Sequence, residues 1–204
     1  MAFDINRGLG KKTNIFYMIF IPTILIIGIT LTILLLALPK IKLVKNKNNY
    51  YEYQTNNEGA GYAAAYTLRC FSVDAKGADI YNEIENKSED GFVYPTDLAK
   101  VFTNRNIKVD IKSNQTIDDL KNDLDNKNPI IVLVKSNNTT TNHYITVVGY
   151  TKESIYCVDS ISKNTTTKDN SRYNRIISNE DFLNIWNVSD EYKNISLILE
   201  SKNE

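Results

Sequence analysis

The chain has 204 residues, enough for one domain of ordinary size and an additional segment. It carries 24 basic and 24 acidic side chains, so its formal net charge is zero, and no overall positive field favours nucleic acid as a partner. The cysteines Cys70 and Cys157 form no C-x-x-C or zinc-binding pattern. We expect two buried, reduced thiols, with one disulfide between them as the alternative.

An uninterrupted apolar run without a charged residue extends over residues 15–38. A helix of this length, at 1.5 Å per residue, is about 36 Å long and can cross a bilayer. Pro22 lies in its first third, where a bilayer helix tolerates proline. A cleaved signal peptide is the competing interpretation, but the run exceeds a usual h-region and no A-x-A site follows it. The sequence therefore predicts a single-pass transmembrane helix over 15–38, preceded by an N-terminal tail of residues 1–14.

Basic residues flank the apolar run on both sides. Arg7, Lys11 and Lys12 precede it with Asp4, and four lysines without a nearby acid follow it within residues 40–47. The positive-inside rule therefore favours the C-terminal side as cytoplasmic by a small margin, and the opposite orientation stays open. We expect residues 39–49 to form a basic, solvated linker, with contact to anionic headgroups as the alternative.

Residues 50–204 are expected to form one domain, whose first part reads as mostly helical. Apolar spacing and helix-start signals predict the helices, and alternation of apolar and polar residues predicts the strand. The expected elements are helices over 60–71 and 76–86, a helix starting at 94–97, a strand over 107–111, and a helix opening with a capping box at 116–119.

The second part of this domain has the composition of a sheet. The expected elements are strands over 129–134, 143–149, 154–158 and 195–199, and one helix that opens with a capping box at 178–181. Helices followed by antiparallel strands indicate an α+β fold.

Three signals in this pattern point to one site. Gln54 lies six positions before Ala60, which opens an alanine-rich helix. His143, the single histidine of the chain, begins a predicted strand, and Asp159 ends the next one. Because the start of one strand and the end of the next are close in an antiparallel hairpin, we expect Asp159 to accept a hydrogen bond from His143. The other imidazole nitrogen would then face position 60.

These motifs resemble those of the double-glycine leader peptidases, papain-like cysteine peptidases that trim bacteriocin and pheromone precursors. The resemblance rests on Gln54-x5-Ala60-Gly-Tyr-Ala-Ala64, on Asn142-His-Tyr-Ile-Thr-Val-Val-Gly-Tyr150 and on Tyr156-Cys-Val-Asp159. It covers nearly all of residues 50–200, and it implies a papain-like fold in which helices pack on an antiparallel sheet. The family has its nucleophilic cysteine where this chain has Ala60, or at Gly59 if the motif is read with one residue fewer.

The resemblance implies specific roles for these residues. With a cysteine at position 60, His143 would take the thiol proton, Asp159 would orient the imidazole, and Gln54 with the backbone N–H of residue 60 would form the oxyanion hole. It also implies a leader peptide with small residues before the cleaved bond, of the Gly-Gly or Gly-Ala type, and an ABC transporter as a nearby partner. It further implies a cytoplasmic domain and no metal or organic cofactor.

Ala60 leaves three functional hypotheses open. The first is a membrane-anchored cysteine peptidase in a form inactivated by an engineered cysteine-to-alanine change, and the second is a natural pseudopeptidase that binds leader peptides or an export partner without cutting. A third is a related papain-like enzyme that catalyses acyl transfer, which also requires the cysteine.

Overall fold

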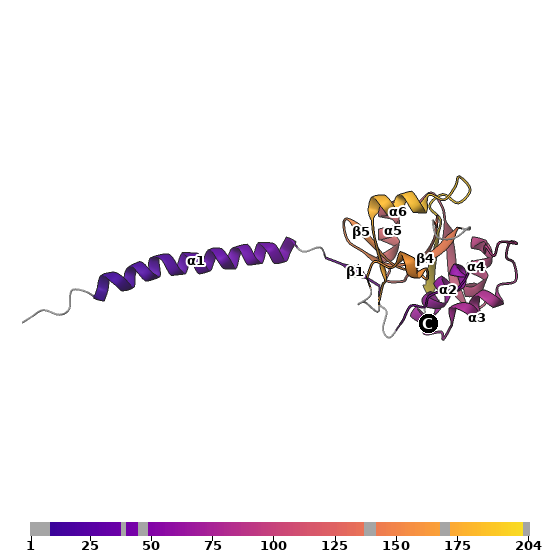
Figure 1. Ribbon diagram of the computed structural model, residues 1–204, viewed down its shortest axis with the longest axis horizontal. Coiled ribbons are helices and arrows are strands. Elements are labelled where there is room, and N and C mark those ends of the chain that lie inside the picture. Colours follow the sequence, from indigo (N-terminus) through magenta and orange to yellow (C-terminus); the bar gives the residue numbers. More distant parts are fainter. Residues whose placement is uncertain (1–8, 38–39, 45–48, 137–141, 168–171, 202–204) are drawn as a thin grey trace, which may run out of the picture. The chain divides into compact units, whose positions relative to one another are not determined.

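The computed structural model describes residues 9–37, 40–44, 49–136, 142–167 and 172–201. The chain divides into two units, residues 1–40 and 41–204. The second unit contains helices and one antiparallel sheet (Figure 1).

The first unit contains one helix, α1 (Leu9–Ala37), with Pro22 inside it. Its described side chains are those of residues 20–34 and Leu36, and all of them are exposed. The hydroxyls of Thr30 and Thr32 donate to backbone carbonyls one turn earlier, at Ile26 and Gly28, so the helix satisfies them internally. Among the residues that the structure describes, no helix has both the length and the apolarity to span a membrane, so the transmembrane prediction over 15–38 is not confirmed.

A seven-stranded antiparallel sheet forms the centre of the second unit. Six strands follow the order β2-β7-β3-β4-β5-β6, and β1 pairs with β4 outside this path. The strands are β1 (Lys42–Leu43), β2 (Ile107–Lys112), β3 (Ile130–Val134), β4 (His143–Tyr150), β5 (Ser154–Val158), β6 (Arg175–Ser178) and β7 (Ser196–Ser201).

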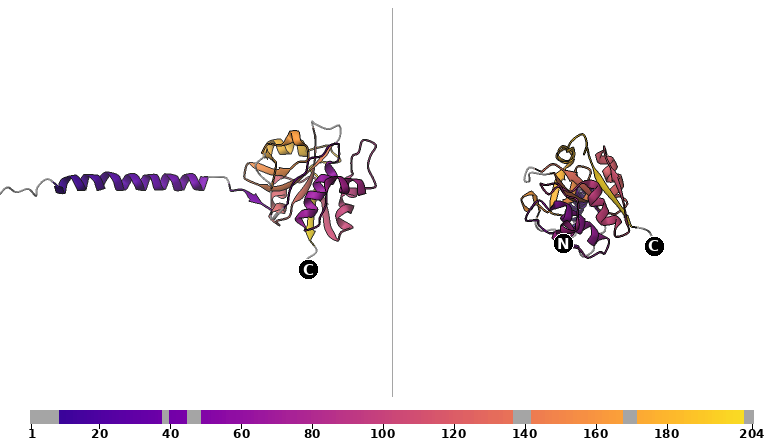
Figure 2. Two further views of the ribbon diagram at one scale, coloured as in Figure 1. Left: turned by 60° about the horizontal axis from the view of Figure 1, so that its bottom comes forward. Right: turned by 90° about the vertical axis from the view of Figure 1, so that its right-hand side faces the viewer.

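Helices cover both faces of this sheet (Figure 2). They are α2 (Gly59–Cys70), α3 (Gly77–Glu83), α4 (Pro95–Thr103), α5 (Ile117–Leu124) and α6 (Asn179–Trp186), with a short 3-10 helix at Ser162–Asn164. Successive side chains of a strand point to opposite faces, so β3 packs Ile131 and Leu133 against α2–α4 and its other residues against α5 and α6. Burial on both faces explains why β3 is continuously apolar.

The local signals in the sequence correspond to the observed helix starts. Thr116 and Asp119 form the predicted capping box at α5, and the Ser178 hydroxyl accepts from the N–H of Asp181 at α6. Pro95 occupies the first turn of α4, where its missing N–H costs no hydrogen bond. The predicted α+β arrangement of helices and antiparallel strands is confirmed.

Two strands were not predicted, and one of them changes the interpretation of the basic linker. Lys42 and Leu43 pair with Tyr150 and Gly149 of β4, at the end that β3 does not reach. The ammonium of Lys42 also binds the carboxylate of Asp125 at 3.0 Å. Residues 41–44 are therefore part of the folded domain, whereas we expected all of 39–49 to be solvated.

The helix that leads to the predicted site packs unusually close to its neighbour. A Cβ added to Gly61 of α2 would overlap the carbonyl oxygen of Gly77 and lie 2.6 Å from the backbone nitrogen of Tyr81 in α3. Only glycine allows this approach, because the contacted atoms are mainly backbone atoms and cannot rotate away. The contact fixes the position of α2 relative to α3.

We predict that Gly61→Ala lowers the free energy of unfolding of the domain by about 1–3 kcal/mol, the usual range for overpacking a core. Urea unfolding of the full chain in detergent, followed by circular dichroism, measures this change. Gly28→Ala is the matched control, because an added Cβ there meets no atom within 4 Å. Equal stability of the two variants would contradict the close packing of α2 and α3.

Candidate functional site

The structure brings His143 and Asp159 together at the ends of two neighbouring strands. His143 is the first residue of β4, and Asp159 follows the last residue of β5. The imidazole Nε2 lies 2.9 Å from the Asp159 carboxylate, and both side chains are buried. The imidazole is therefore held through Nε2, which leaves Nδ1 to face the rest of the site.

Asp159 accepts hydrogen bonds at both carboxylate oxygens. One oxygen accepts from His143 and from the N–H of Ile161, and the other accepts from Asn164 and from Arg175. Burial by itself would raise the pKa of Asp159, but His143 and then Arg175 outweigh it and lower this pKa to about 2. The carboxylate is thus ionised at neutral pH, so Nε2 carries a proton that it donates to Asp159.

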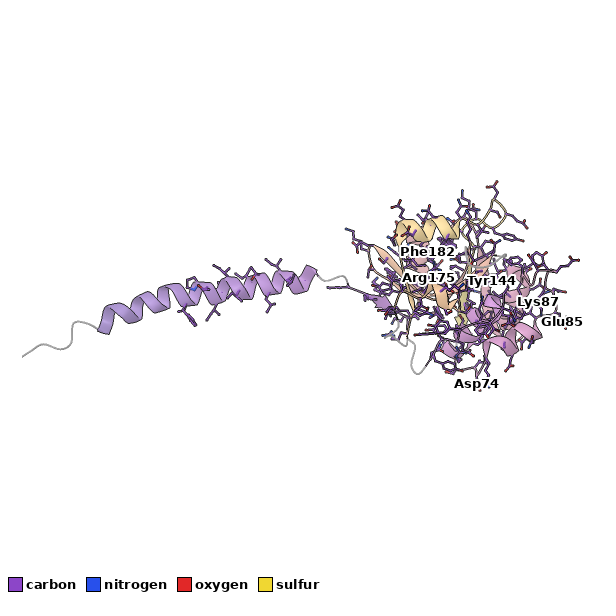
Figure 3. All side chains as sticks on the ribbon, viewed as in Figure 1. Asp74, Glu85, Lys87, Tyr144, Arg175 and Phe182 are labelled. Carbon is purple, nitrogen blue, oxygen red and sulfur yellow. The ribbon has the colours of Figure 1, made fainter. Side chains whose placement is uncertain are left out.

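Sequence analysis did not identify three residues that support Asp159: Asn164, Asn174 and Arg175. The Arg175 guanidinium lies 2.7 Å from the carboxylate, and the side-chain amide of Asn174 binds both the N–H and the carbonyl of Asp159. Arg175 begins β6 and lies opposite Cys157 of β5 in the β5–β6 pairing, and Asn174 directly precedes it. No local sequence signal marks this pairing, because it joins segments separated by a polar loop. Figure 3 labels Arg175 within the domain and Glu85 and Lys87 at its periphery.

The residue against the imidazole is Gly59. A Cβ added to Gly59 would overlap Nδ1 and Cε1 of His143 and would lie 3.2 Å from Oε1 of Gln54. Ala60, the position that we preferred from the sequence, is buried in the core formed by α2–α4 and one face of the sheet. The geometry therefore favours Gly59 as the position that faces His143, which is the alternative reading of the motif.

Gln54 lies beside the same point. Its backbone N–H donates to the carbonyl of Ser160, and its Oε1 accepts from the Ser160 hydroxyl at 3.0 Å. The structure thus gathers Gln54, Gly59, His143 and Asp159. In this orientation Gln54 presents an acceptor, whereas an oxyanion hole requires a donor. Its role as an oxyanion donor stays a prediction.

A small cavity opens next to His143. It is lined by residues of α2, β4 and the segment before α4: Asn57, Gly59, Ala60, Gly91, Phe92, Val93, Asn142, His143 and Tyr144. The Tyr144 hydroxyl donates to the carbonyl of Val93, and its ring stacks on Phe92 at a centroid distance of 6.2 Å. These contacts hold the segment before α4 against β4 and form one wall of the cavity.

The two cysteines do not supply a nucleophile to this site. Cys157 is fully buried, and burial raises the pKa of its thiol. Burial also raises the pKa of Cys70 to about 11, although a hydrogen bond from Asn49 opposes this effect. Both are free cysteines, but only Cys157 is buried as expected, and Cys70 is half-buried. Thiols with raised pKa values carry little thiolate at neutral pH.

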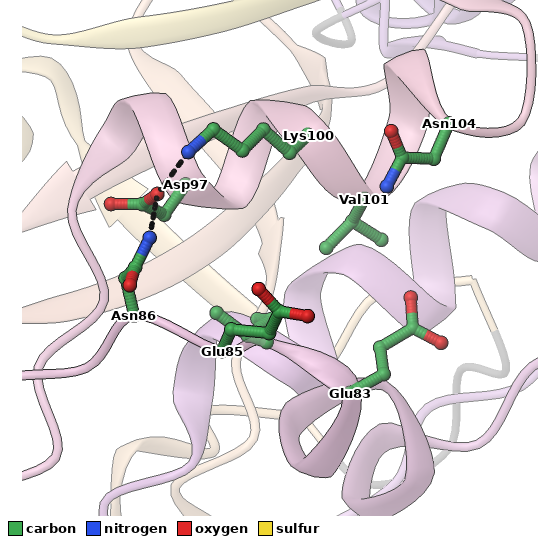
Figure 4. A pocket seen from close by; sticks show the side chains of 8 residues that line it. Glu83, Glu85, Asn86, Asp97, Lys100, Val101 and Asn104 are labelled. Carbon is green, nitrogen blue, oxygen red and sulfur yellow. Dashed lines mark hydrogen bonds and ion pairs between the residues drawn. The ribbon is translucent and has the colours of Figure 1, made fainter.

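A larger hollow of about 150 Å³ lies between the end of α3 and α4 (Figure 4). Its carboxylates include Asp97, which binds Lys100 and Asn86, and Glu83, which pairs with Arg105. None of the predicted site residues lines it. Within the described residues, no cluster of His, Cys, Asp and Glu side chains is arranged to hold a metal ion.

The pKa of Asp159 leads to a prediction about stability. Because the folded state lowers this pKa from 3.8 to about 2, the carboxylate stabilises the fold above pH 4 and loses this effect as the pH falls toward 2. We expect a contribution of about 2 kcal/mol, from about 1.4 kcal/mol per pKa unit. Asp159→Asn should lower stability at pH 7 and flatten the pH dependence between pH 4 and 2, as measured by urea unfolding. The exposed Asp74→Asn variant is the control, and an unchanged slope in Asp159→Asn would refute the assignment.

Comparisons with known proteins agree with this architecture. The model of the Peptidase_C39 like family matches residues 45–194. No curated protein sequence matches the chain. A C39-like peptidase from Bacillus anthracis is similar in structure, with a TM-score of 0.60 and 15% identity, over 80% of this chain and 100% of that one.

Two further structures share the fold. The peptidase domain of Streptococcus ComA, a bi-functional ABC transporter involved in quorum sensing, has a TM-score of 0.59 and 13% identity, over 76% of this chain and 100% of that one. A double glycine motif protease from an AMS/PCAT transporter, solved in complex with a leader peptide, has a TM-score of 0.55 and 15% identity, over 79% of this chain and 100% of that one. Since the family model covers most of the chain, this protein belongs to the Peptidase_C39 like family, and its second unit has the α+β, papain-like fold of C39 peptidases.

Proposed function

We propose that this chain is a peptide-binding member of the C39-like family that does not cleave its ligand. The observation that carries the proposal is the contact between Gly59 and His143. The position that faces imidazole Nδ1 has no side chain, and the next residue is Ala60, so neither can attack a peptide carbonyl. A papain-like site without a nucleophile keeps its means of holding a peptide but loses the covalent step.

The placement of the imidazole also supports binding without cleavage. His143 occupies the space that a Cβ at position 59 would need, and its partner Asp159 is fixed by four hydrogen bonds. A nucleophile at position 59 would therefore require displacement of a buried, hydrogen-bonded ring. This arrangement supports binding without cleavage over an active site that lacks only a sulfur atom.

The ligand class is inferred from similar proteins. One similar structure is a double glycine motif protease in complex with a leader peptide, and another is the peptidase domain of an ABC transporter. We therefore propose a leader peptide with a Gly-Gly pair as the ligand and a peptide exporter of the ABC class as a partner. The narrow cavity at Gly59 and Gly91 is consistent with residues that have little or no side chain.

A second candidate is a cysteine peptidase of which this chain is an inactivated form, with its nucleophile replaced at Ala60 or Gly59. The hydrogen bond between His143 and Asp159 favours it, because an active thiolate–imidazolium site uses the same arrangement. The two candidates differ in what a restored cysteine would do.

We also propose that residues 15–38 hold the domain at a membrane, with the domain on the cytoplasmic side. The apolar run lacks charged residues, and the described α1 side chains include exposed isoleucines and leucines such as Ile26, Ile29 and Leu34. The four lysines within residues 40–47 support the cytoplasmic orientation.

Peptide binding and cleavage can be tested together. A fluorescent leader-type peptide with an internal Gly-Gly pair is titrated against the full chain in detergent, with a Val-Val peptide as the control, and mass spectrometry monitors its integrity. We expect micromolar binding that is at least about 10-fold weaker for Val-Val, and an intact peptide. Gly59→Cys and Ala60→Cys should not cleave it, and Gly59→Ala controls for the effect of a side chain at this position on the fold.

Cleavage by either cysteine variant would overturn the binding-only proposal in favour of the peptidase. Equal affinity for the two peptides would contradict recognition of Gly-Gly.

The membrane proposal has its own test. Cells that express the full chain are fractionated, and the membranes are washed with alkaline carbonate. We expect the chain to stay in the pellet and the double variant Ile26→Arg/Ile29→Arg to leave it, because arginine at the centre of a bilayer helix costs about 3 kcal/mol per residue on insertion scales. Leu183→Arg, an exposed site on α6, is the control. Release of the unaltered chain into the supernatant would exclude an integral anchor.

A further inference from the structure

The first turn of α2 has no capping group. Glu58 at the N-cap position makes no side-chain capping hydrogen bond, and the first turn contains no acidic residue. Backbone N–H groups from Gly61 onward find acceptors in the chain, starting with the carbonyl of Glu58. Within the described residues, the N–H groups of Gly59 and Ala60 have no acceptor. This helix end therefore presents two donors and the positive end of a helix dipole.

The imidazole of His143 is directed at the same point. Its side chain is only 3% exposed, and Nδ1 has no hydrogen-bond partner among the described residues. Because Nε2 donates its proton to the ionised Asp159, Nδ1 donates only when the ring is protonated on both nitrogens. Arg175 balances the charge of Asp159, so the site has no uncompensated negative charge that would repel an anion.

We propose that this site binds the free C-terminal carboxylate of a peptide that ends in small residues. This inference rests on the proposed peptide-binding function and names the ligand more narrowly. One carboxylate oxygen would accept from the N–H groups at the start of α2, and the other would accept from Nδ1 of His143. Such an oxygen would approach through the cavity that Gly59 and His143 line together.

The chemistry of the site favours a carboxylate over the carbonyl of an uncut peptide. An internal carbonyl is neutral and gains less from the two free N–H donors and the positive end of the helix dipole than an anion does. Gln54 can add a donor, because the Ser160 hydroxyl both donates and accepts. Rotation of the Gln54 amide by 180° therefore retains the bond to Ser160 and turns Nε2 toward Gly59.

A carboxylate ligand places the protein after a cleavage step in a reaction sequence. Hydrolysis of a peptide bond after a small residue releases a peptide whose new C-terminus is a carboxylate. An endopeptidase with this specificity must supply the ligand, because the site described here has no nucleophile. The protein would then retain the released leader and not the intact precursor.

Three peptides of identical leader sequence test the proposal. The first ends in Gly-Gly with a free carboxylate, the second ends in the Gly-Gly amide, and the third continues for several residues after Gly-Gly. Affinities are measured by fluorescence anisotropy with the full chain in detergent, and with the variants His143→Leu and Leu183→Arg. His143→Leu removes the Nδ1 donor and places an apolar side chain in the same buried position. Leu183→Arg is a surface control.

We expect the free acid to bind at least about 10-fold more tightly than the amide and the extended peptide, as one charge-assisted hydrogen bond allows. In His143→Leu this preference should fall below about 3-fold, and in Leu183→Arg it should persist. Equal binding of acid and amide, or tighter binding of the extended peptide, would overturn the carboxylate proposal and leave peptide binding intact. Failure of all three peptides to bind would overturn the proposed function itself.

Discussion

The buried carboxylate of Asp159 is the interaction on which the candidate site depends. It joins the end of β5 to the start of β4 through His143 and to β6 through Arg175. A buried carboxylate without partners would be strongly destabilising, so the four donors around it are a requirement of the fold as well as of the site. This dual role ties the histidine and the aspartate to the fold as well as to the site, because together with Arg175 they hold three strands together.

Three glycines allow parts of the domain to approach one another closely. Gly59 allows His143 to rest against the first turn of α2, and Gly61 allows α2 to approach α3. Gly149 lets the backbone of Lys42 approach β4, which joins the segment after α1 to the sheet. In each case the atom that a side chain would meet is fixed, so the geometry depends on a missing Cβ. The placement of the imidazole against the first turn of α2 is therefore a consequence of the glycine at position 59.

The fold and much of the site could be predicted from the sequence because their signals are local. Alternation and continuous apolar runs marked β2–β5 and β7, and capping residues marked the starts of α5 and α6. The proximity of His143 and Asp159 followed from their places at the ends of two consecutive antiparallel strands. The contributions of Arg175 and Asn174 could not be predicted, since they act across the β5–β6 pairing, and the pairing of β6 is fixed by tertiary packing.

The sequence by itself determined that this chain has an α+β domain with a single histidine, which follows from composition and periodicity. The papain-like fold was implied by the resemblance of its motifs to those of a known peptidase family. Only the tertiary structure decided that Gly59, one of the two candidate positions, has its missing side chain directed at the His143 ring, while Ala60 lines the same cavity. Neighbouring positions in the first turn of a helix differ by about 100° in direction. The choice between them therefore depends on how α2 is rotated against the sheet, and close packing with α3 and β4 sets that rotation.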